Sequence, residues 1–143
     1  MSKAITTKSK FSRTTSVEID INAPADAVWS ILTDAGSYPL WNSTIVSLEG
    51  SIDVGSTIRL VSKLDPKRTF KLKVKEFVPN TLLVWGDPMG KRTYTLQEKS
   101  GVTHVTMTEK IGGPIFPLFA SKIPSFDASF DQFVTDLKKE AEK

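Results

Sequence analysis

The sequence contains no cysteine and only one histidine, His104, among its 143 residues. Without cysteine the chain can form no disulfide, no thiolate metal site and no cysteine nucleophile, and this usage is typical of a reducing compartment. No apolar run approaches the roughly 20 residues of a membrane-spanning helix. The basic start MSKAITTKSKFSRTT is not followed by a signal-peptide core. We therefore expect a soluble, cytoplasmic protein with no integral membrane segment.

Familiar catalytic and metal-binding motifs are missing as well. The chain has no phosphate-binding glycine loop, no HExxH, no GxSxG and no second histidine. We therefore expect no cofactor and no bound metal. We also expect no nucleic-acid partner, because no nucleic-acid motif accompanies the basic residues.

The surplus of basic charge is small and unevenly spread. Nineteen lysines and arginines stand against 16 acidic residues, a net charge of +3. Much of the surplus lies at the amino terminus and between residues 59 and 75, and the amino-terminal members are Lys3, Lys8, Lys10 and Arg13. In FKLKVK, residues 70–75, lysines alternate with apolar residues at the period of a strand. These lysines form either a solvated sheet face or a surface for an anionic partner.

Periodicity predicts one strand, two short helices and six further strands. Apolar residues alternate with acidic ones over residues 13–22 and recur at helical spacing over residues 25–34. The stretch SYPLWN, residues 37–42, suits a loop or a very short helix beginning at Pro39. A bulge is expected near residues 75–77, where the alternation changes phase. The six strands are expected at residues 45–49, 57–64, 69–78, 81–86, 91–99 and 102–111.

The last third of the chain changes to helical spacing. Apolar residues recur at intervals of four, three, one and three from Phe126 to Leu137, which predicts one apolar stripe of a long helix. Pro114, Pro117 and Pro124 interrupt the preceding stretch. There we expect a kink or a separate short segment that covers the cavity as a lid.

This order of elements predicts the fold class. A sheet with one apolar face and a long helix with one apolar stripe form an α+β domain, in which a curved seven-stranded antiparallel sheet wraps around the C-terminal helix. We expect residues 1–12 to be a flexible basic tail and residues 13–142 to form a single domain. A cavity between helix and sheet is a usual place for a small ligand.

Several segments resemble a known family in their order and spacing. They are INAPADAVWSILTDAGSYPLWN, VGSTIRL, VPNTLLVWGDP, the GVT that enters the last strand, EKIGGPIFPLF and a final amphipathic helix ending in LKKEAE. Together they span residues 13–142 and resemble the START-like, Bet v 1-like (SRPBCC) superfamily, specifically its bacterial polyketide cyclase/dehydrase-like branch. The resemblance implies the helix-grip fold, which matches the order of elements above.

The resemblance implies several kinds of function. Members bind lipids, sterols, hormones or polyketides, a few are cyclases or dehydratases, and others are co-chaperone or assembly domains, so fold alone does not choose. Our leading hypothesis is the binding of a small hydrophobic or amphipathic ligand, such as a lipid, polyketide or aromatic metabolite. One alternative is a cyclase or dehydratase that uses Glu109 and Tyr94, and a second is a protein-interaction module. We expect a monomer or a weak homodimer.

The alternation within each predicted strand indicates which polar side chains point toward the cavity and which point to solvent. Glu109 shares a face with apolar residues that we place in the cavity, whereas His104 points to solvent. Glu109 either pairs with Arg92 or Lys110 or lies in water at the sheet rim, or else it binds a ligand hydroxyl or acts as an acid or base. Tyr94 either packs in the core or orients a polar ligand atom.

Aromatic residues supply most of the expected cavity wall. Trp85 lies near a strand end, at the rim or in the wall, and Asp87 after it either stabilises a turn or acts as an acid. Trp41 and Tyr38 either plug the core beneath the short helices or wall the cavity. The full set of expected cavity residues is Trp41, Tyr38, Phe70, Leu72, Trp85, Tyr94, Leu96, Met107, Glu109, Phe116, Phe119, Phe126 and Phe130.

Overall fold

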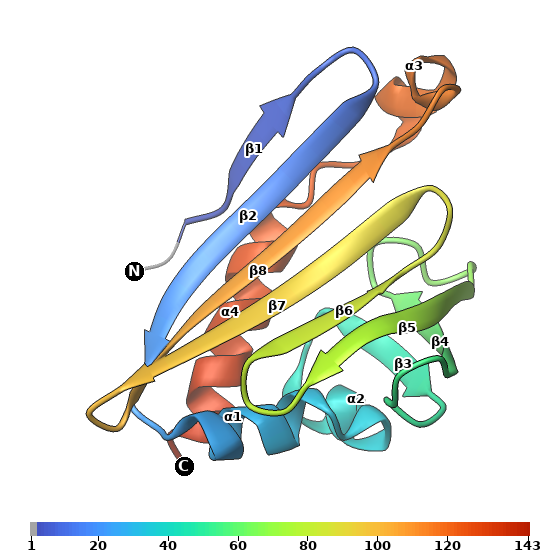
Figure 1. Ribbon diagram of the computed structural model, residues 1–143. Coiled ribbons are helices and arrows are strands. Elements are labelled where there is room, and N and C mark those ends of the chain that lie inside the picture. Colours follow the sequence, from blue (N-terminus) through green and yellow to red (C-terminus); the bar gives the residue numbers. More distant parts are fainter. Residues whose placement is uncertain (1–2) are drawn as a thin grey trace.

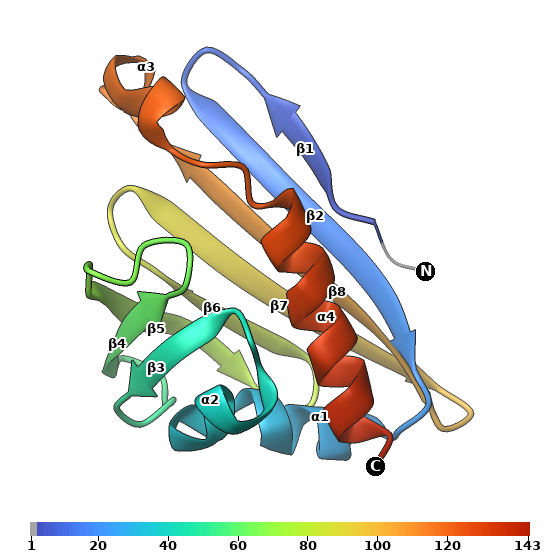
Figure 2. The ribbon, with the colours of Figure 1, turned by 180° about the vertical axis from the view of Figure 1, so that it is seen from behind.

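One antiparallel sheet and one long helix make up the two layers of the protein. The computed structural model describes residues 3–143, with the side chain of Phe119 outside the described part. The sheet has the strand order β1-β2-β8-β7-β6-β5-β4-β3, and α4 lies across one of its faces (Figures 1 and 2). The strands are β1 (Ile5–Lys8), β2 (Ser12–Ile21), β3 (Ile45–Glu49), β4 (Thr57–Ser62), β5 (Phe70–Val78), β6 (Leu82–Gly86), β7 (Gly90–Lys99) and β8 (Val102–Gly112).

The helices sit at both ends of the sheet and across it. Two of them, α1 (Ala25–Leu32) and α2 (Tyr38–Trp41), close one end, while α3 (Phe116–Phe119) lies at the other end beside the β1–β2 turn (Figure 1). A 3₁₀ turn (Ala120–Lys122) follows α3, and α4 (Asp127–Ala141) then runs back along the sheet. Within residues 3–143, no helix combines the length and the apolar character needed to cross a bilayer.

The fold confirms the sequence-based order of elements and corrects the number of strands. The predicted phase change appears as a pairing shift between Val74 and Glu76, where β5 meets β6. The sheet has eight strands rather than seven, because β1 lies in the stretch assigned to a tail. Its sequence ITTK has one apolar residue, Ile5, which is exposed. Strand β1 therefore carries no alternating apolar pattern, and hydrogen bonds to β2 hold it in place.

The core lies between the inner face of the sheet and the apolar stripe of α4. Phe130, Phe133, Val134 and Leu137 of that stripe are all buried. Each such side chain contributes roughly 1.5–3 kcal/mol by leaving water. Around α1 and α2 the core is filled by side chains, whereas the other end, near α3, holds a pocket.

Candidate ligand-binding pocket

The pocket opens between α4 and the ends of the central strands. Its volume is about 250 Å³, near the lower end of the roughly 300–1,000 Å³ of small-molecule sites. Three connections frame it: the β4–β5 loop, the β6–β7 turn and the segment between α3 and α4. The inner strands supply the floor, so the sheet and the helix both contribute walls.

Most of the lining is apolar. The aromatic and aliphatic members come from the sheet, from its loops, from the segment before α4 and from α4, and they are Ile45, Leu60, Leu64, Phe70, Leu72, Trp85, Met89, Met107, Ile111, Ile123, Phe126, Phe130 and Phe133. Short polar side chains, those of Thr44, Ser62 and Ser129, also belong to the wall. Besides Arg92 and Glu109, the charged members of the lining are Asp65, Arg68, Asp87, Lys91 and Lys122. Such a lining suits an apolar ligand body with few polar atoms.

An ion pair between Arg92 and Glu109 stands in this apolar wall. The two residues face each other across β7 and β8, and Arg92 Nε donates to Glu109 Oε1 at 2.7 Å. Their side chains are only 13% and 19% exposed. The guanidinium also lies over the ring of Phe130, 5.0 Å from its centroid. Burial alone would lower the pKa of Arg92, but the carboxylate of Glu109 and the hydroxyl of Tyr94 raise it, so Arg92 stays charged.

Each member of the pair keeps hydrogen-bonding capacity. Among the described residues, no hydrogen bond reaches Glu109 Oε2 or Arg92 Nη2. A bound molecule could therefore donate to the carboxylate and accept from the guanidinium at the same place.

Tyr94 lies behind this pair, outside the pocket lining. Its ring is fully buried, 5.2 Å from Trp85 and 5.8 Å from Phe133 between centroids. Its hydroxyl accepts a long hydrogen bond of 3.5 Å from Arg92 Nη1. Burial raises the pKa of Tyr94, so the phenol is neutral at ordinary pH. Of the two positions that the sequence left open for Tyr94, in the core or in the cavity wall, the ring occupies the core.

The pocket brings together about half of the predicted cavity residues. Those that line it are Phe70, Leu72, Trp85, Met107, Glu109, Phe126 and Phe130. Those that lie elsewhere among the described residues are Trp41, Tyr38, Tyr94, Leu96 and Phe116. The Phe119 side chain falls outside the described part of the structure. Leu96 lies on β7 beyond Tyr94, away from the pocket mouth and in the filled part of the core.

Tyr38 and Trp41 pack in the core at the closed end. The Tyr38 hydroxyl donates to the carbonyl of Leu32 at 2.6 Å, and burial raises the pKa of Tyr38 well above its ordinary value. The Trp41 ring is 4.9 Å from Tyr38 and 5.8 Å from Phe133. SYPLWN is thus a short helix whose aromatic rings fill the core beneath the sheet.

Arg13 is a pocket-positioning residue that sequence reasoning missed. The sequence grouped it only with the surplus basic charge of the amino terminus, but it is 8% exposed on the inner face of β2. Its guanidinium donates to the carbonyls of Ile123 (3.2 Å) and Pro124 (2.8 Å) and lies over the Phe126 ring. Arg13 lies at even spacing from Val17 and Ile19, which places all three side chains on the same face of the strand. This spacing is the sequence signal for its position.

The remaining polar candidates, Asp87 and His104, have hydrogen-bond partners within the fold, and Asp87 also lines the pocket. Asp87 accepts hydrogen bonds from the backbone amides of Met89 and Gly90, both at 2.9 Å, as the turn interpretation predicted. His104 lies on the outer face of the sheet, as predicted, and contacts Glu18 and Asp20. No cluster of three or more His, Asp or Glu residues within residues 3–143 could hold a metal ion.

Known proteins with the same architecture support the family and fold. The family described as polyketide cyclase/dehydrase and lipid transport matches residues 12–142. A search of curated proteins found no match. A conserved protein of unknown function from Enterococcus faecalis, EF2215, is similar with a TM-score of 0.72 and 16% identity, over 99% of this chain and 78% of that one.

Two further structures give the same result. A START superfamily protein from Mycobacterium smegmatis has a TM-score of 0.64 and 16% identity, over 90% of this chain and 97% of that one. DynU16, from the dynemicin biosynthetic locus, has a TM-score of 0.67 and 22% identity, over 90% of this chain and 46% of that one. At these identities the likeness shows the helix-grip fold alone.

Proposed function

We propose, since the chain belongs to the polyketide cyclase/dehydrase and lipid transport family, that its pocket binds a small amphipathic molecule. The ligand has an apolar body, aromatic or aliphatic, and a neutral polar group such as a phenol, alcohol or enol. Family and fold are consistent with a domain that binds hydrophobic ligands. The pocket chemistry narrows the choice of ligand.

The Arg92–Glu109 pair in an apolar wall is the observation that carries this proposal. A hydroxyl group donates one hydrogen bond and accepts others, so it can serve Glu109 Oε2 and Arg92 Nη2 together. The pair has no net charge. A ligand carboxylate would meet the negative charge of Glu109 in a partly dry site, where like charges repel strongly. A neutral polar group avoids this cost.

Binding is favoured over catalysis by the same geometry. Glu109 already accepts a 2.7 Å hydrogen bond from Arg92, so its use as a base would require loss of that contact. Tyr94, the other half of the enzyme hypothesis, is fully buried behind the lining. The cyclase or dehydratase alternative therefore retains one of its two residues in the pocket.

Calorimetric titration with three probes of one shape tests the ligand class. We expect 2-naphthol to bind more tightly than naphthalene, which lacks a polar group, and than 2-naphthoate, which is anionic. In Glu109→Gln the carboxylate acceptor is lost, so 2-naphthol should bind about tenfold or more weakly. The same variant removes the negative partner of Arg92 and should bind 2-naphthoate better than the wild type does. Glu76→Gln, on an exposed position of β5, is the matched control.

Three outcomes would contradict the proposal. They are a wild-type preference for 2-naphthoate, equal losses for all three probes in Glu109→Gln, and no binding of any probe. Native mass spectrometry of the protein purified from its own host gives a second readout, a retained small molecule. Conversion of that molecule by the wild type but not by Glu109→Gln, with affinity unchanged, would instead favour the enzyme alternative.

A further inference from the structure

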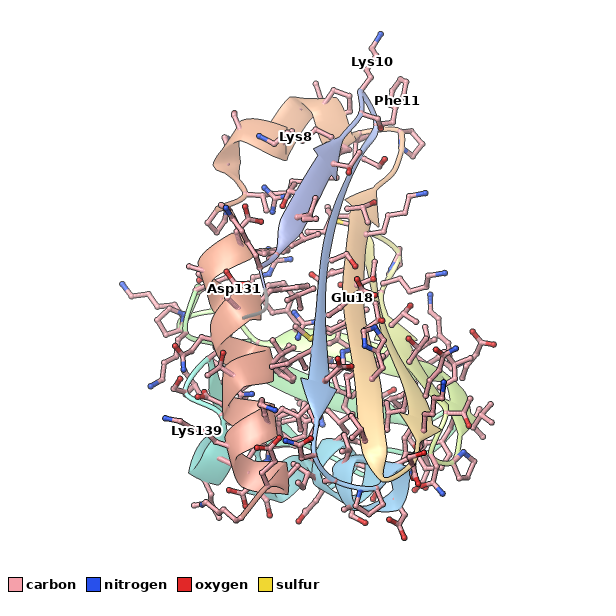
Figure 3. All side chains as sticks on the ribbon, turned by 90° about the vertical axis from the view of Figure 1, so that its left-hand side faces the viewer. Lys8, Lys10, Phe11, Glu18, Asp131 and Lys139 are labelled. Atoms are coloured by element: carbon pink, nitrogen blue, oxygen red, sulfur yellow. The ribbon has the colours of Figure 1, made fainter. Side chains whose placement is uncertain are left out.

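Five of the ten large apolar side chains that are exposed among the described residues lie at the end of the protein that holds the pocket mouth. The backbone segments that carry them, namely the β1–β2 turn, the β4–β5 loop, the β6–β7 turn and the stretch from Ile115 into α3, lie at this end in Figure 1. Phe11 is 50% exposed and Leu118 is 81% exposed, and Figure 3 shows Phe11 at the outer tip of its turn. The set is Phe11, Leu64, Met89, Ile115 and Leu118.

Hydrogen bonds and the pocket join these segments into one surface. The amide of Gly113 donates to the carbonyl of Phe11 at 3.1 Å, and that of Gly112 donates to the carbonyl of Met89 at 2.9 Å. Leu64 and Met89 also line the pocket mouth. These five apolar side chains therefore belong to one continuous end of the molecule.

The same end concentrates the positive charge of the chain. Residues 8–12, 62–69, 86–91 and 110–126, which we name the basic tip, contain eight basic and two acidic residues, a net charge of +6. The other residues carry 11 basic and 14 acidic side chains, a net charge of −3. All eight basic side chains are exposed. They are Lys8, Lys10, Lys63, Lys67, Arg68, Lys91, Lys110 and Lys122.

We propose that the basic tip docks onto the surface of an anionic lipid bilayer. Clustered lysines are attracted to the negative surface potential of such a membrane, and exposed apolar side chains among them enter the headgroup layer. The pocket opens within the basic tip, so a hydrophobic ligand passes between pocket and bilayer without crossing water. Docking is independent of which ligand the pocket binds.

The choice of residues favours a membrane over a protein or nucleic-acid partner. Seven of the eight basic residues in the basic tip are lysines. Protein interfaces are depleted in lysine and enriched in arginine, and arginine is also preferred for bidentate recognition of phosphates in nucleic acids. Lysine suits a diffuse anionic surface, which needs positive charge but no fixed geometry.

Sedimentation with lipid vesicles tests the docking. We expect binding to vesicles made of equal parts phosphatidylcholine and phosphatidylglycerol, little binding to phosphatidylcholine alone, and weaker binding at high salt. The double variant Lys8→Gln/Lys10→Gln should bind about 30-fold more weakly, roughly fivefold for each lysine. Phe11→Ser/Leu118→Ser should also weaken binding while leaving its salt dependence in place.

Matched variants at the far end serve as controls. Leu40, on α2, is even more exposed than Leu118, and Lys139 lies near the end of α4 (Figure 3). Leu40→Ser and Lys139→Gln should bind vesicles as the wild type does. None of the substituted residues lines the pocket. Titration with 2-naphthol should therefore be unchanged in every variant, which separates failure of docking from failure of the proposed function.

Two kinds of result would overturn the membrane assignment. One is absence of binding to the anionic vesicles, or equal losses in the far-end controls. The other is binding to soluble polyaspartate as tight as to vesicles, sensitive to Lys8 and Lys10 but not to Phe11 and Leu118. That second result would assign the basic tip to an acidic protein partner.

Discussion

Arg92 carries a charge into an apolar wall, and its neighbours compensate for the lost hydration. Glu109 supplies the opposite charge, while Phe130 offers its ring face to the guanidinium. Removal of one partner of such a pair leaves an uncompensated charge and costs more than removal of both. Arg92 and Glu109 therefore act as one unit, and variants of either must be compared with the double variant.

His104 gives the protein a pH-dependent contribution to stability. Hydrogen bonds to Glu18 and Asp20 raise the pKa of His104 above its ordinary value of 6.5. The ion pairs therefore stabilise the fold fully below the unfolded-state pKa, and the contribution is lost as pH rises through the folded-state pKa. His104 is 40% exposed, so the effect should stay below about 1 kcal/mol.

Urea unfolding of wild type and His104→Gln at two pH values measures this effect. We expect the variant to be less stable near pH 5.5, about one unit below the ordinary pKa of histidine, and the difference to vanish near pH 9. Asp20→Asn should reduce the same pH dependence. A stability difference that is equal at both pH values would rule out the charged pairs as its cause.

At the scale of elements, the sequence predicted what periodicity can encode. The strands β3 and β6, the helix α4 and the β5 bulge follow from alternation and helical spacing. Strand β1 could not be predicted, because it carries no alternating apolar pattern and is held by pairing with β2 and by contacts to α4, which leave no periodic signal. The apolar alternation of β8 was enough to place Glu109 on the pocket face of the sheet. The position of SYPLWN outside the pocket could not be predicted in this way, because it depends on how α2 packs in the core.

The segment between α3 and α4 depends on Arg13 for its position over the pocket. Arg13→Met removes two hydrogen bonds from a charged donor to Ile123 and Pro124, each worth roughly 1.5–3 kcal/mol. We expect faster amide hydrogen exchange over residues 118–126 and weaker 2-naphthol binding. The measurement is hydrogen exchange by mass spectrometry.

Arg59→Met, an exposed position of β4, is the control for the loss of a basic side chain. It should leave exchange in this segment unchanged. Arg13→Lys should resemble Arg13→Met, since an ammonium group cannot reproduce the two-pronged contact. Unchanged exchange in Arg13→Met would show that the segment is held by its apolar contacts alone.

At the scale of the whole molecule, the two ends differ in packing and in charge. The end closed by α1 and α2 is filled with aromatic and aliphatic side chains, and the other end holds the pocket and the basic tip. An apolar cavity that opens inside a positively charged end is what the proposed docking on an anionic surface requires. The proposed ligand binding and the proposed docking thus use the same end of the fold, and variants of different residues test them separately.

The first strand and the last helix are joined by side chains of α4, which ties the two layers together. Asp131 Oδ1 accepts a 2.6 Å hydrogen bond from the backbone amide of Ala4, and Asp127 accepts one from the Thr6 hydroxyl (Figure 3 labels Asp131). Asp131→Ala should therefore release β1 and lower the free energy of unfolding by about 1 kcal/mol. Hydrogen exchange should accelerate over Ile5–Lys8 but not in β7 or β8. Glu140→Ala, which removes only a contact to Lys143, should leave β1 protected, and equal acceleration in both variants would contradict the proposed link.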